Sequence, residues 1–219
     1  MEVELLDRRL KKMESFVRSL QTAPGVRAVI LTGSMTTGAA SEKSDIDLLI
    51  ISAPKRLYTA RFFVTILAIL SGNKRRVYDK NPAGKFCLNF SLPSDKLDIL
   101  PHDRRCAGFH RHIINLWDSG GIFEQILAEN SWLKDYDVKI ESQENVNQIK
   151  KIFPIKSSKK LSSIQKIGEL FFYGWFGDFI ENVQFKIQKS VVESRLMFKM
   201  DKYRFVVEKN ELRLHPKKR

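Results

Sequence analysis

The stretch AVILTGSMTTGAASEKSDIDLLII, residues 28–51, contains two apolar runs separated by a loop rich in Gly, Ser, Thr and Ala. Short apolar runs between turn residues are typical of buried strands, so we expect strands over residues 26–32 and 45–52. Side chains along a strand alternate between its two faces. Asp45 and Asp47 should therefore lie on one face of the second strand, while the apolar residues between them face the core.

These two carboxylates and the loop before them form a pattern suited to phosphate chemistry. Carboxylates held side by side repel each other, and a hard divalent cation removes that repulsion while it binds phosphate oxygens. Gly33 allows a sharp turn and lets a ligand approach the backbone closely. The hydroxyl group of Ser34 and the neighbouring backbone amides can donate hydrogen bonds to phosphate. The pattern therefore indicates a binding site for a metal-bound triphosphate.

The segment resembles the nucleotidyltransferase superfamily, which includes DNA polymerase beta, the minimal nucleotidyltransferases and the antibiotic nucleotidyltransferases. The signature of that superfamily is an apolar strand ending in Gly-Ser, a short spacer, and Asp-x-Asp on a second apolar strand. Here Gly33, Ser34, Asp45 and Asp47 match it residue by residue. Three later stretches are loosely similar to a prokaryotic subgroup that implies no activity beyond the superfamily's: Phe86–Phe90, Asn130–Tyr136 and Leu212–Lys217.

The resemblance implies a fold of the α/β (α+β) class, with a polymerase-beta-like nucleotidyltransferase core built on a small mixed sheet. It implies that Asp45 and Asp47 are catalytic residues that hold Mg²⁺ or Mn²⁺. It also implies that Gly33 and Ser34 bind a nucleoside triphosphate such as ATP. The implied reaction is transfer of a nucleoside monophosphate to the hydroxyl group of an acceptor that the sequence does not identify.

The superfamily pattern includes a third carboxylate on a later strand, between apolar residues. This chain offers Asn89 on a clear strand over 85–92, and Asp98 on a weaker candidate strand over 96–100. We favour Asn89 as the equivalent position and count it among the catalytic residues. An amide cannot act as a base, however, so a weakly active or inactive nucleotide- or RNA-binding module is the alternative function. An interaction protein of the toxin–antitoxin type is the third hypothesis.

A basic residue near the second strand is a further candidate for binding the triphosphate. Arg61 falls on an expected helix over 57–71 and could reach the phosphates. The alternative interpretation is a surface arginine without a ligand.

Composition excludes several classes of protein. The chain has 219 residues, of which 43% are hydrophobic and 29% are charged, as is ordinary for a globular protein. Its two cysteines exclude a disulfide scaffold. The longest apolar stretch, residues 62–70, is far shorter than the roughly 20 residues of a membrane-spanning helix. We therefore expect a cytoplasmic protein with no membrane partner.

Charge and patterning divide the chain into two regions. We expect a nucleotidyltransferase core over 1–135 and a basic, mainly helical C-terminal region over 136–219. The formal charge is +13, and the region from Lys151 onward contains 16 basic residues but only 7 acidic ones. Such a field attracts polyanions, so a nucleic acid is a candidate acceptor. Aromatic residues four apart within 161–200 favour a buried helix face or a homodimer contact, with base stacking as the alternative.

The remaining patterns predict elements that surround this core. They are a helix over 3–20, a short strand over 75–78, one or two helices within 111–133, a linker over 135–160, and a terminal hairpin followed by a basic tail.

Overall fold

The computed structural model describes residues 3–76, 79, 81–196, 203–209 and 211–216. Its α-helices are α1 Val3–Leu20, α2 Leu57–Leu70, α3 Arg104–His110, α4 Ile122–Glu129, α5 Gln143–Ile152, α6 Lys159–Phe171 and α7 Gly174–Leu196. Its strands are β1 Val26–Thr32, β2 Ile46–Ser52, β3 Phe86–Pro93, β4 Ile114–Asp118, β5 Tyr203–Glu208 and β6 Glu211–Pro216. Two short 3₁₀ helices, η1 Gly33–Thr37 and η2 Ser131–Asp135, complete the secondary structure.

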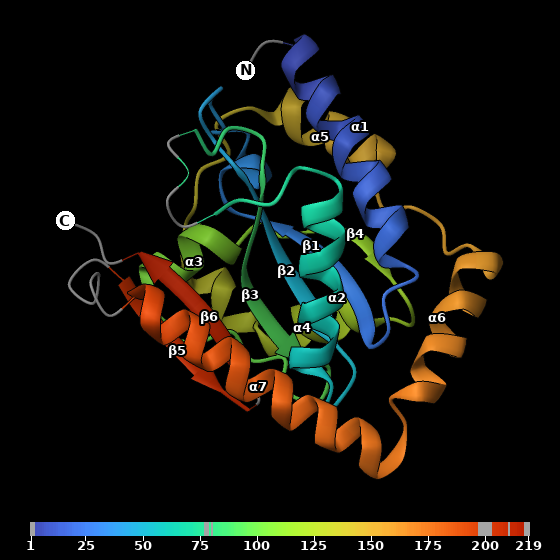
Figure 1. Cartoon of the computed structure of the whole chain (residues 1–219). Coiled ribbons are helices and arrows are strands. Elements are labelled where there is room, and N and C mark those ends of the chain that lie inside the picture. Colours follow the sequence, from blue (N-terminus) through green and yellow to red (C-terminus); the bar gives the residue numbers. More distant parts are fainter. Residues whose placement is uncertain (1–2, 77–78, 80, 197–202, 210, 217–219) are drawn as a thin grey trace.

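The six strands form one mixed sheet in the order β4-β1-β2-β3-β6-β5 (Figure 1). Strands β2 and β3 run parallel, and α2 connects them, while every other neighbouring pair is antiparallel. The small mixed sheet and the α/β class that the resemblance implied are confirmed. The C-terminal hairpin extends this sheet, because β6 pairs with β3. The boundary expected near residue 135 stays a prediction.

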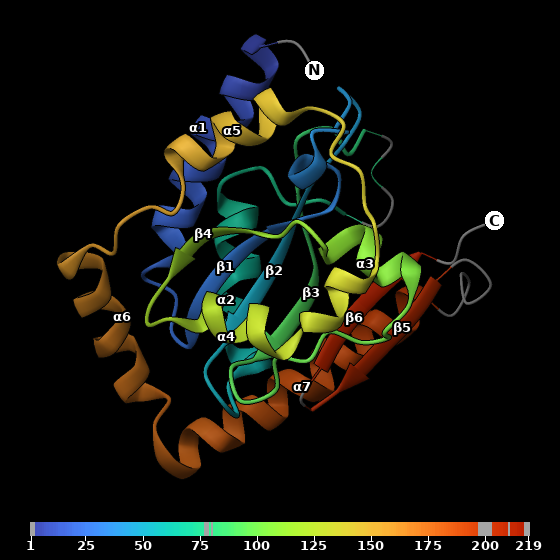
Figure 2. The same ribbon diagram turned by 180° about the vertical axis from the view of Figure 1, so that it is seen from behind.

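Helices cover both faces of the sheet, as the views in Figures 1 and 2 show. Helices α1 and α2 lie on one face, and α3 and α4 lie on the other. Alternation along the strands explains this layering, since Leu48 of β2 packs toward α1 and α2, whereas Leu49 packs with Cys106 of α3 and Ile126 of α4. The two faces bury separate apolar clusters, and the face of α3 and α4 is the one that carries Asp47.

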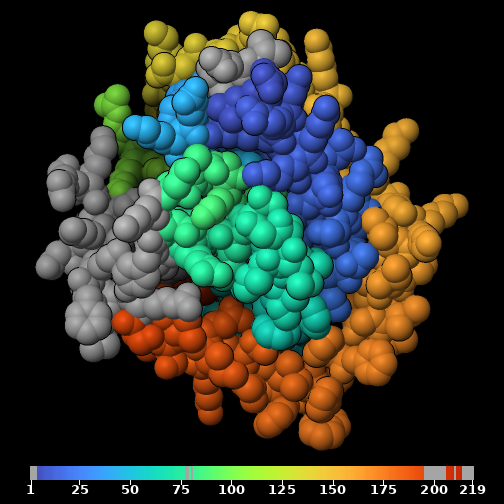
Figure 3. All heavy atoms as spheres, turned by 45° about the horizontal axis from the view of Figure 1, so that its top comes forward, coloured from blue at the N-terminus to red at the C-terminus, as the bar shows by residue number. Residues whose placement is uncertain are grey.

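Helix α7 packs on α2, on the same face of the sheet as α1. In Figure 3, α2 (teal) lies between α1 (blue) and α7 (orange). Tyr58 of α2, Phe185 and Val192 of α7, and Leu212 of β6 pack together. Strand β6 also pairs with β3. The C-terminal region therefore contacts the core through both β6 and α7.

Residues 111–133 differ from the sequence expectation of helices alone. The segment contains β4, an edge strand that pairs with β1, and then α4 and the start of η2. Pairing with β1 supplies backbone hydrogen bonds that a pattern within the segment cannot reveal. The expected linker over 135–160 likewise contains α5, whose Val146 and Ile149 pack into the core on the side of α1.

The weaker candidate strand over 96–100 does not form. Leu97 and Ile99 are buried, as strand alternation would place them, but no strand within the described residues pairs with them. The side chain of Asn130 takes the role of a partner: its amide nitrogen donates to the Leu97 oxygen over 2.8 Å, and its oxygen accepts from the Ile99 nitrogen over 2.7 Å. A side chain from the end of α4 thus makes the backbone hydrogen bonds that a neighbouring strand would otherwise make.

The long helix expected over 161–200 is divided into α6 and α7. The break follows Phe171, and Gly174 begins α7 with φ at +66°. A Cβ atom on Gly177 would lie 1.8 Å from the Phe172 oxygen, so this sharp bend requires glycine there.

The aromatic residues within 161–200 were expected to form a buried helix face. That expectation is wrong at the bend between α6 and α7. Tyr173 is 84% exposed and Trp175 is 81% exposed, because the opposite side of α7 is the one that packs on α2. We call the exposed group the α6–α7 surface; it consists of Leu170, Phe171, Tyr173, Trp175, Phe176 and Phe179.

Two further expectations involve parts of the chain that the structure leaves undescribed. The strand over 75–78 includes residues 77–78, and the basic tail is residues 217–219; both lie outside the described residues. A membrane-spanning helix is also not found, since none of the described helices combines the necessary length with sufficient apolarity.

Candidate active site

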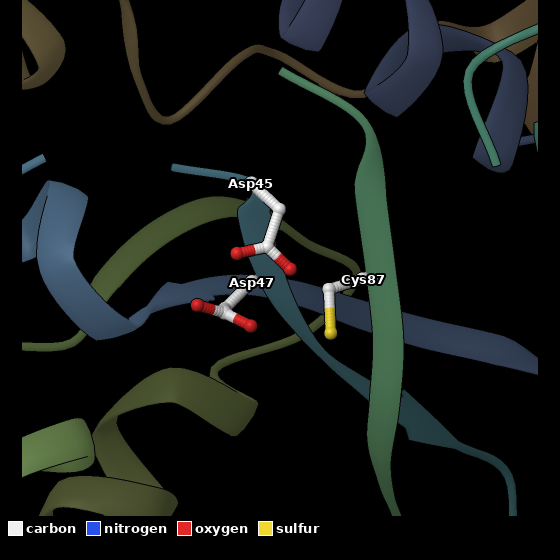
Figure 4. Close-up of side chains that lie close together, drawn as sticks. All are labelled: Asp45, Asp47 and Cys87. Atoms are coloured by element: carbon white, nitrogen blue, oxygen red, sulfur yellow. The ribbon is translucent and has the colours of Figure 1, made fainter. Parts of the chain in front are cut away.

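The two carboxylates of the sequence motif meet a thiol from the neighbouring strand. Asp47 of β2 lies directly opposite Cys87 of β3 in the parallel pairing, and Asp45 immediately precedes β2. One ligand atom from each of the three side chains lies within 4.8 Å of the others. Figure 4 shows both carboxylates and the sulfur directed toward the same space. The predicted sharing of one face by Asp45 and Asp47 is confirmed.

A cavity of about 220 Å³ opens beside this group. Strands β1, β2 and β3 supply one wall, and the C-terminal end of α3 supplies another. The described residues that line it are Thr32, Asp45, Asp47, Leu48, Arg75, Cys87, Asn89, Phe90, Phe109 and His110. The cavity therefore combines carboxylate, thiol, amide and guanidinium groups with an apolar surface from Phe90 and Phe109.

The loop that leads into Asp45 is held from α1. The guanidinium of Arg9 is almost completely buried and donates to the backbone oxygens of Ser41, Glu42 and Ser44 over 3.0, 2.8 and 2.9 Å. Burial lowers the pKa of Arg9, although the nearby charge of Asp45 opposes that effect. Three bonds from one cation thus fix the chain one residue before the first carboxylate.

Gly33 supplies the space that Asp47 occupies. Its φ is +74°, and a Cβ atom built on it would lie 2.5 Å from Oδ2 of Asp47. Both the backbone conformation and the packing therefore require glycine. Ser34 follows in η1, whose backbone turn is closed by bonds such as that from the Thr36 hydroxyl to the Gly33 oxygen over 2.8 Å.

The electrostatics of the site reflect two carboxylates in a confined space. Burial, and then the charge of Asp45, raise the pKa of Asp47 to about 6. The Cys87 thiol donates to Asp47, and burial raises the pKa of that thiol. Arg75 forms an ion pair with Asp45, and its Nη1 lies 3.5 Å from the Cys87 sulfur. One guanidinium therefore offsets part of the negative charge at the site.

The structure separates the two candidates for the third position. Asn89 lines the cavity with Asp45 and Asp47. Asp98 lies after the end of β3, and its Oδ1 is 2.7 Å from Nε2 of His102 on the exposed surface. Asp98 is not among the described residues that line the cavity. The catalytic role of Asn89 stays a prediction.

Arg61 approaches from the opposite side of the sheet. It belongs to α2, which packs on the face away from Asp47, and its guanidinium donates to the Leu88 oxygen of β3. Burial lowers the pKa of Arg61 to about 10. Arg61 is not among the described lining residues of the cavity, so its contact with a triphosphate stays a prediction.

Sequence reasoning missed Cys87 and Arg75. Strand alternation places Cys87 and Asn89 on one face in an unbroken strand, but only a carboxylate was sought there. The parallel pairing of β2 with β3 makes Cys87 the direct partner of Asp47, and the register shifts only after that pair. Arg75 lies eleven positions before the start of β3, and no local pattern indicates that it contacts Asp45.

The fold and the site agree with the resemblance found in the sequence. The mixed sheet, the Gly-Ser turn that follows β1 and the neighbouring carboxylates of Asp45 and Asp47 are the features that the resemblance predicted. Residues 10–90 match the family model of the nucleotidyltransferase domain, so this part of the chain is a nucleotidyltransferase domain. Searches of curated proteins and of solved structures returned no match.

The side chains at the site fit a divalent cation. Carboxylate oxygens are suitable ligands for such ions, and the charge of Asp45 helps to raise the pKa of Asp47, so a positive charge between the two would be favourable. The candidate metal-binding group is therefore Asp45, Asp47 and Cys87.

Proposed function

We propose that this protein is a metal-dependent nucleotidyltransferase that transfers a nucleoside monophosphate from a nucleoside triphosphate to an acceptor hydroxyl. The observation that carries the proposal is the convergence of Asp45 and Asp47 beside a cavity within the matched domain. The oxygen of the acceptor attacks the α-phosphorus, the bond to the bridging oxygen breaks, pyrophosphate leaves, and the hydroxyl proton passes to solvent.

Each side chain has a separate task in this proposal. Asp45 and Asp47 would hold the divalent cation, for which Mg²⁺ and Mn²⁺ are the ions implied by the resemblance. When bound, such an ion neutralises charge on the phosphate oxygens. Ser34 and the backbone at Gly33 would hold the triphosphate, and Asn89 would orient it through its amide. Positioning and charge neutralisation account for most catalysis in phosphoryl transfer.

A nucleotide-binding module without efficient turnover is the second candidate. It is favoured by one observation: the strand beside β2 presents Cys87 and Asn89 to the cavity rather than a third carboxylate. Neither side chain is a general base in this setting, since an amide does not ionise and burial raises the pKa of the thiol.

The acceptor and the cellular location are further parts of the proposal. The excess of basic residues after Lys151 supports a polyanionic acceptor such as RNA. Cys87 and Cys106 are both free and buried, which supports a reducing compartment such as the cytoplasm.

We also propose that a second copy of this chain covers the α6–α7 surface. Aromatic side chains offer about 150–250 Å² each, so this group approaches the roughly 800 Å² that each partner buries in a stable interface. A monomer rarely exposes an apolar patch larger than a few hundred Å².

The test of the proposed activity is an assay with α-labelled nucleoside triphosphates. Purified protein is incubated with Mg²⁺ or Mn²⁺ and with cellular RNA, a small-molecule extract or the protein alone as acceptor. We expect transfer by the wild type and its loss in Asp45→Ala and Asp47→Ala. Asp95→Asn, at an exposed carboxylate outside the cavity, is the control and should retain full activity.

The outcomes separate the two candidates. Label on one acceptor fraction identifies the class of acceptor. Metal-dependent nucleotide binding without release of pyrophosphate favours the binding module, and full activity of either aspartate variant excludes the proposed mechanism.

A further inference from the structure

Cys87 occupies the position where the site needs its third protein ligand. In the parallel pairing it lies opposite Asp47, whereas Asn89 lies two residues further along β3, where the register has shifted and Leu49 pairs with Phe90. Its sulfur lies in the group whose ligand atoms are all within 4.8 Å of one another (Figure 4). The three side chains thus present two oxygens and one sulfur to a common space.

The surroundings of Cys87 distinguish it from a cysteine that only fills the core. The residue is 3% exposed, yet its sulfur contacts charged groups: the thiol donates to Asp47, and Nη1 of Arg75 lies 3.5 Å away. Cys106 provides the comparison within the same chain. It is 4% exposed and packs among apolar residues of the face that carries α3 and α4, with its sulfur 3.7 Å from the Leu100 oxygen.

The donor set has a consequence for the choice of ion. Mg²⁺ is bound through oxygen ligands, whereas Zn²⁺ and Co²⁺ accept thiolate together with carboxylate. We propose that Cys87 is a metal ligand and that the Asp45–Asp47–Cys87 site selects a thiophilic divalent ion, Zn²⁺ or Co²⁺, over Mg²⁺. This inference deepens the proposed nucleotidyl transfer, on which it rests, by naming the class of ion.

Arg75 supports the same assignment. Its guanidinium forms an ion pair with Asp45 and approaches the sulfur, so a positive group already contacts two of the three ligands. A metal ion bound by those ligands would displace this contact and leave Arg75 at the wall of the cavity, where it could pair with a phosphate group.

The experiment uses Co²⁺ as a spectroscopic probe of the purified full chain. A thiolate bound to Co²⁺ produces a charge-transfer absorption in the near ultraviolet that carboxylate ligands do not produce. The chain has two cysteines, so Cys106→Ser leaves Cys87 as the single thiol. We expect the absorption in the wild type and in Cys106→Ser, and its loss when Zn²⁺ is added as a competitor.

A second variant tests the contribution of the thiol to affinity. Loss of an outer-shell partner of a metal ligand already costs about 10- to 100-fold in affinity, so Cys87→Ser should weaken Co²⁺ binding at least about tenfold. Cys87→Asp should restore an all-oxygen site and shift the preference toward Mg²⁺. Calorimetric titrations with Co²⁺, Zn²⁺ and Mg²⁺ measure both effects.

Three results would overturn the inference: Co²⁺ bound without the absorption in Cys106→Ser, unchanged affinity in Cys87→Ser, or no binding of either thiophilic ion. These readouts do not depend on turnover. Nucleotidyl transfer with Mg²⁺ in a protein that lacks the thiolate signal retains the proposed function and removes this inference. A thiolate signal without transfer under any ion retains the metal site and removes the proposed function.

Discussion

At the scale of single residues, Gly33 links the conformation of the loop to the position of a carboxylate. Replacement by alanine places a Cβ atom 2.5 Å from Oδ2 of Asp47 and forces a side chain into a positive-φ conformation. We expect Gly33→Ala to lower the free energy of unfolding by about 1–3 kcal/mol and to abolish metal binding. Urea denaturation and calorimetric metal titration measure the two effects.

Gly72 offers a matched control for this prediction. Its φ is +68°, close to that of Gly33, and a Cβ atom on it meets nothing within 4 Å. Gly72→Ala should therefore lower the free energy of unfolding only through the strained backbone conformation. The affinity of this variant for the metal ion should be unchanged. Equal loss of metal binding in both variants would show that Gly33 acts through general stability.

Asp47 should make the stability of the metal-free protein depend on pH. Burial and the charge of Asp45 raise its pKa from 3.8 to about 6. Between these values the folded state binds the proton more tightly than the unfolded state, so stability falls as the pH rises from about 4 to about 6. Above that range the contribution is constant, because Asp47 is ionised in both states.

The measurement is urea denaturation from pH 4 to pH 8 in the presence of a chelator. Asp47→Asn cannot ionise, so the stability of the wild type relative to this variant should decline through that interval. A difference that stays level across it would exclude Asp47 as the source.

At the scale of secondary-structure elements, α7 provides a cap for α2. The N-cap residue of α2, Arg56, forms no side-chain capping bond. Instead, Glu181 accepts from the backbone nitrogens of Tyr58 and Thr59, each over 2.8 Å, and from the Thr59 hydroxyl over 2.7 Å. A carboxylate at a helix N-terminus is also favoured by the helix dipole. Helix α7 therefore contributes hydrogen bonds as well as apolar packing.

Removal of this cap should destabilise the fold. Glu181→Ala leaves part-buried donors of α2 without their acceptor, so we expect the free energy of unfolding to fall by about 1–3 kcal/mol. Glu193→Ala is the control on the same helix, because among the described residues Glu193 forms an exposed pair with Lys189 at 3.8 Å and no bond to a buried group. That variant should change stability by less than about 0.5 kcal/mol. Similar losses in both variants would argue against the capping role.

At the scale of the whole molecule, the α6–α7 surface and the net charge act in opposite directions on self-association. The exposed apolar group favours a dimer, whereas a formal charge of +13 on each chain opposes it. Salt screens the repulsion and leaves the apolar contact intact. We therefore expect a dimer that becomes tighter as salt concentration rises.

Light scattering over a series of protein and salt concentrations tests this prediction. The mass should rise from 25.4 kDa toward twice that value, and Trp175→Glu should remain a monomer. Leu127→Glu, at a 43% exposed position on α4, which packs on the sheet face opposite α2, is the control and should dimerise normally. If the wild type stays monomeric at every protein and salt concentration, a second copy does not cover the α6–α7 surface, and a different partner would have to cover it.

The sequence alone determined the central part of this protein. Strand alternation placed Asp45 and Asp47 on one face, and the Gly-Ser turn identified the domain, because both depend on spacing within a few residues. The helices α1 and α2 and the strand β3 were predicted for the same reason. Local periodicity indicates which side of a helix or strand is apolar. It does so whichever segment packs against that side.

Only the tertiary structure decided what surrounds those carboxylates. Cys87 faces Asp47 because β2 and β3 pair in one particular register, and Arg75 pairs with Asp45 across 30 residues. Asn130 bonds the backbone at Leu97 in place of a partner strand, so the strand expected there does not form. The aromatic stripe was misassigned because an apolar pattern does not show which segment covers it. Contacts between distant segments depend on pairing register and packing, and these properties are absent from any local stretch of the chain.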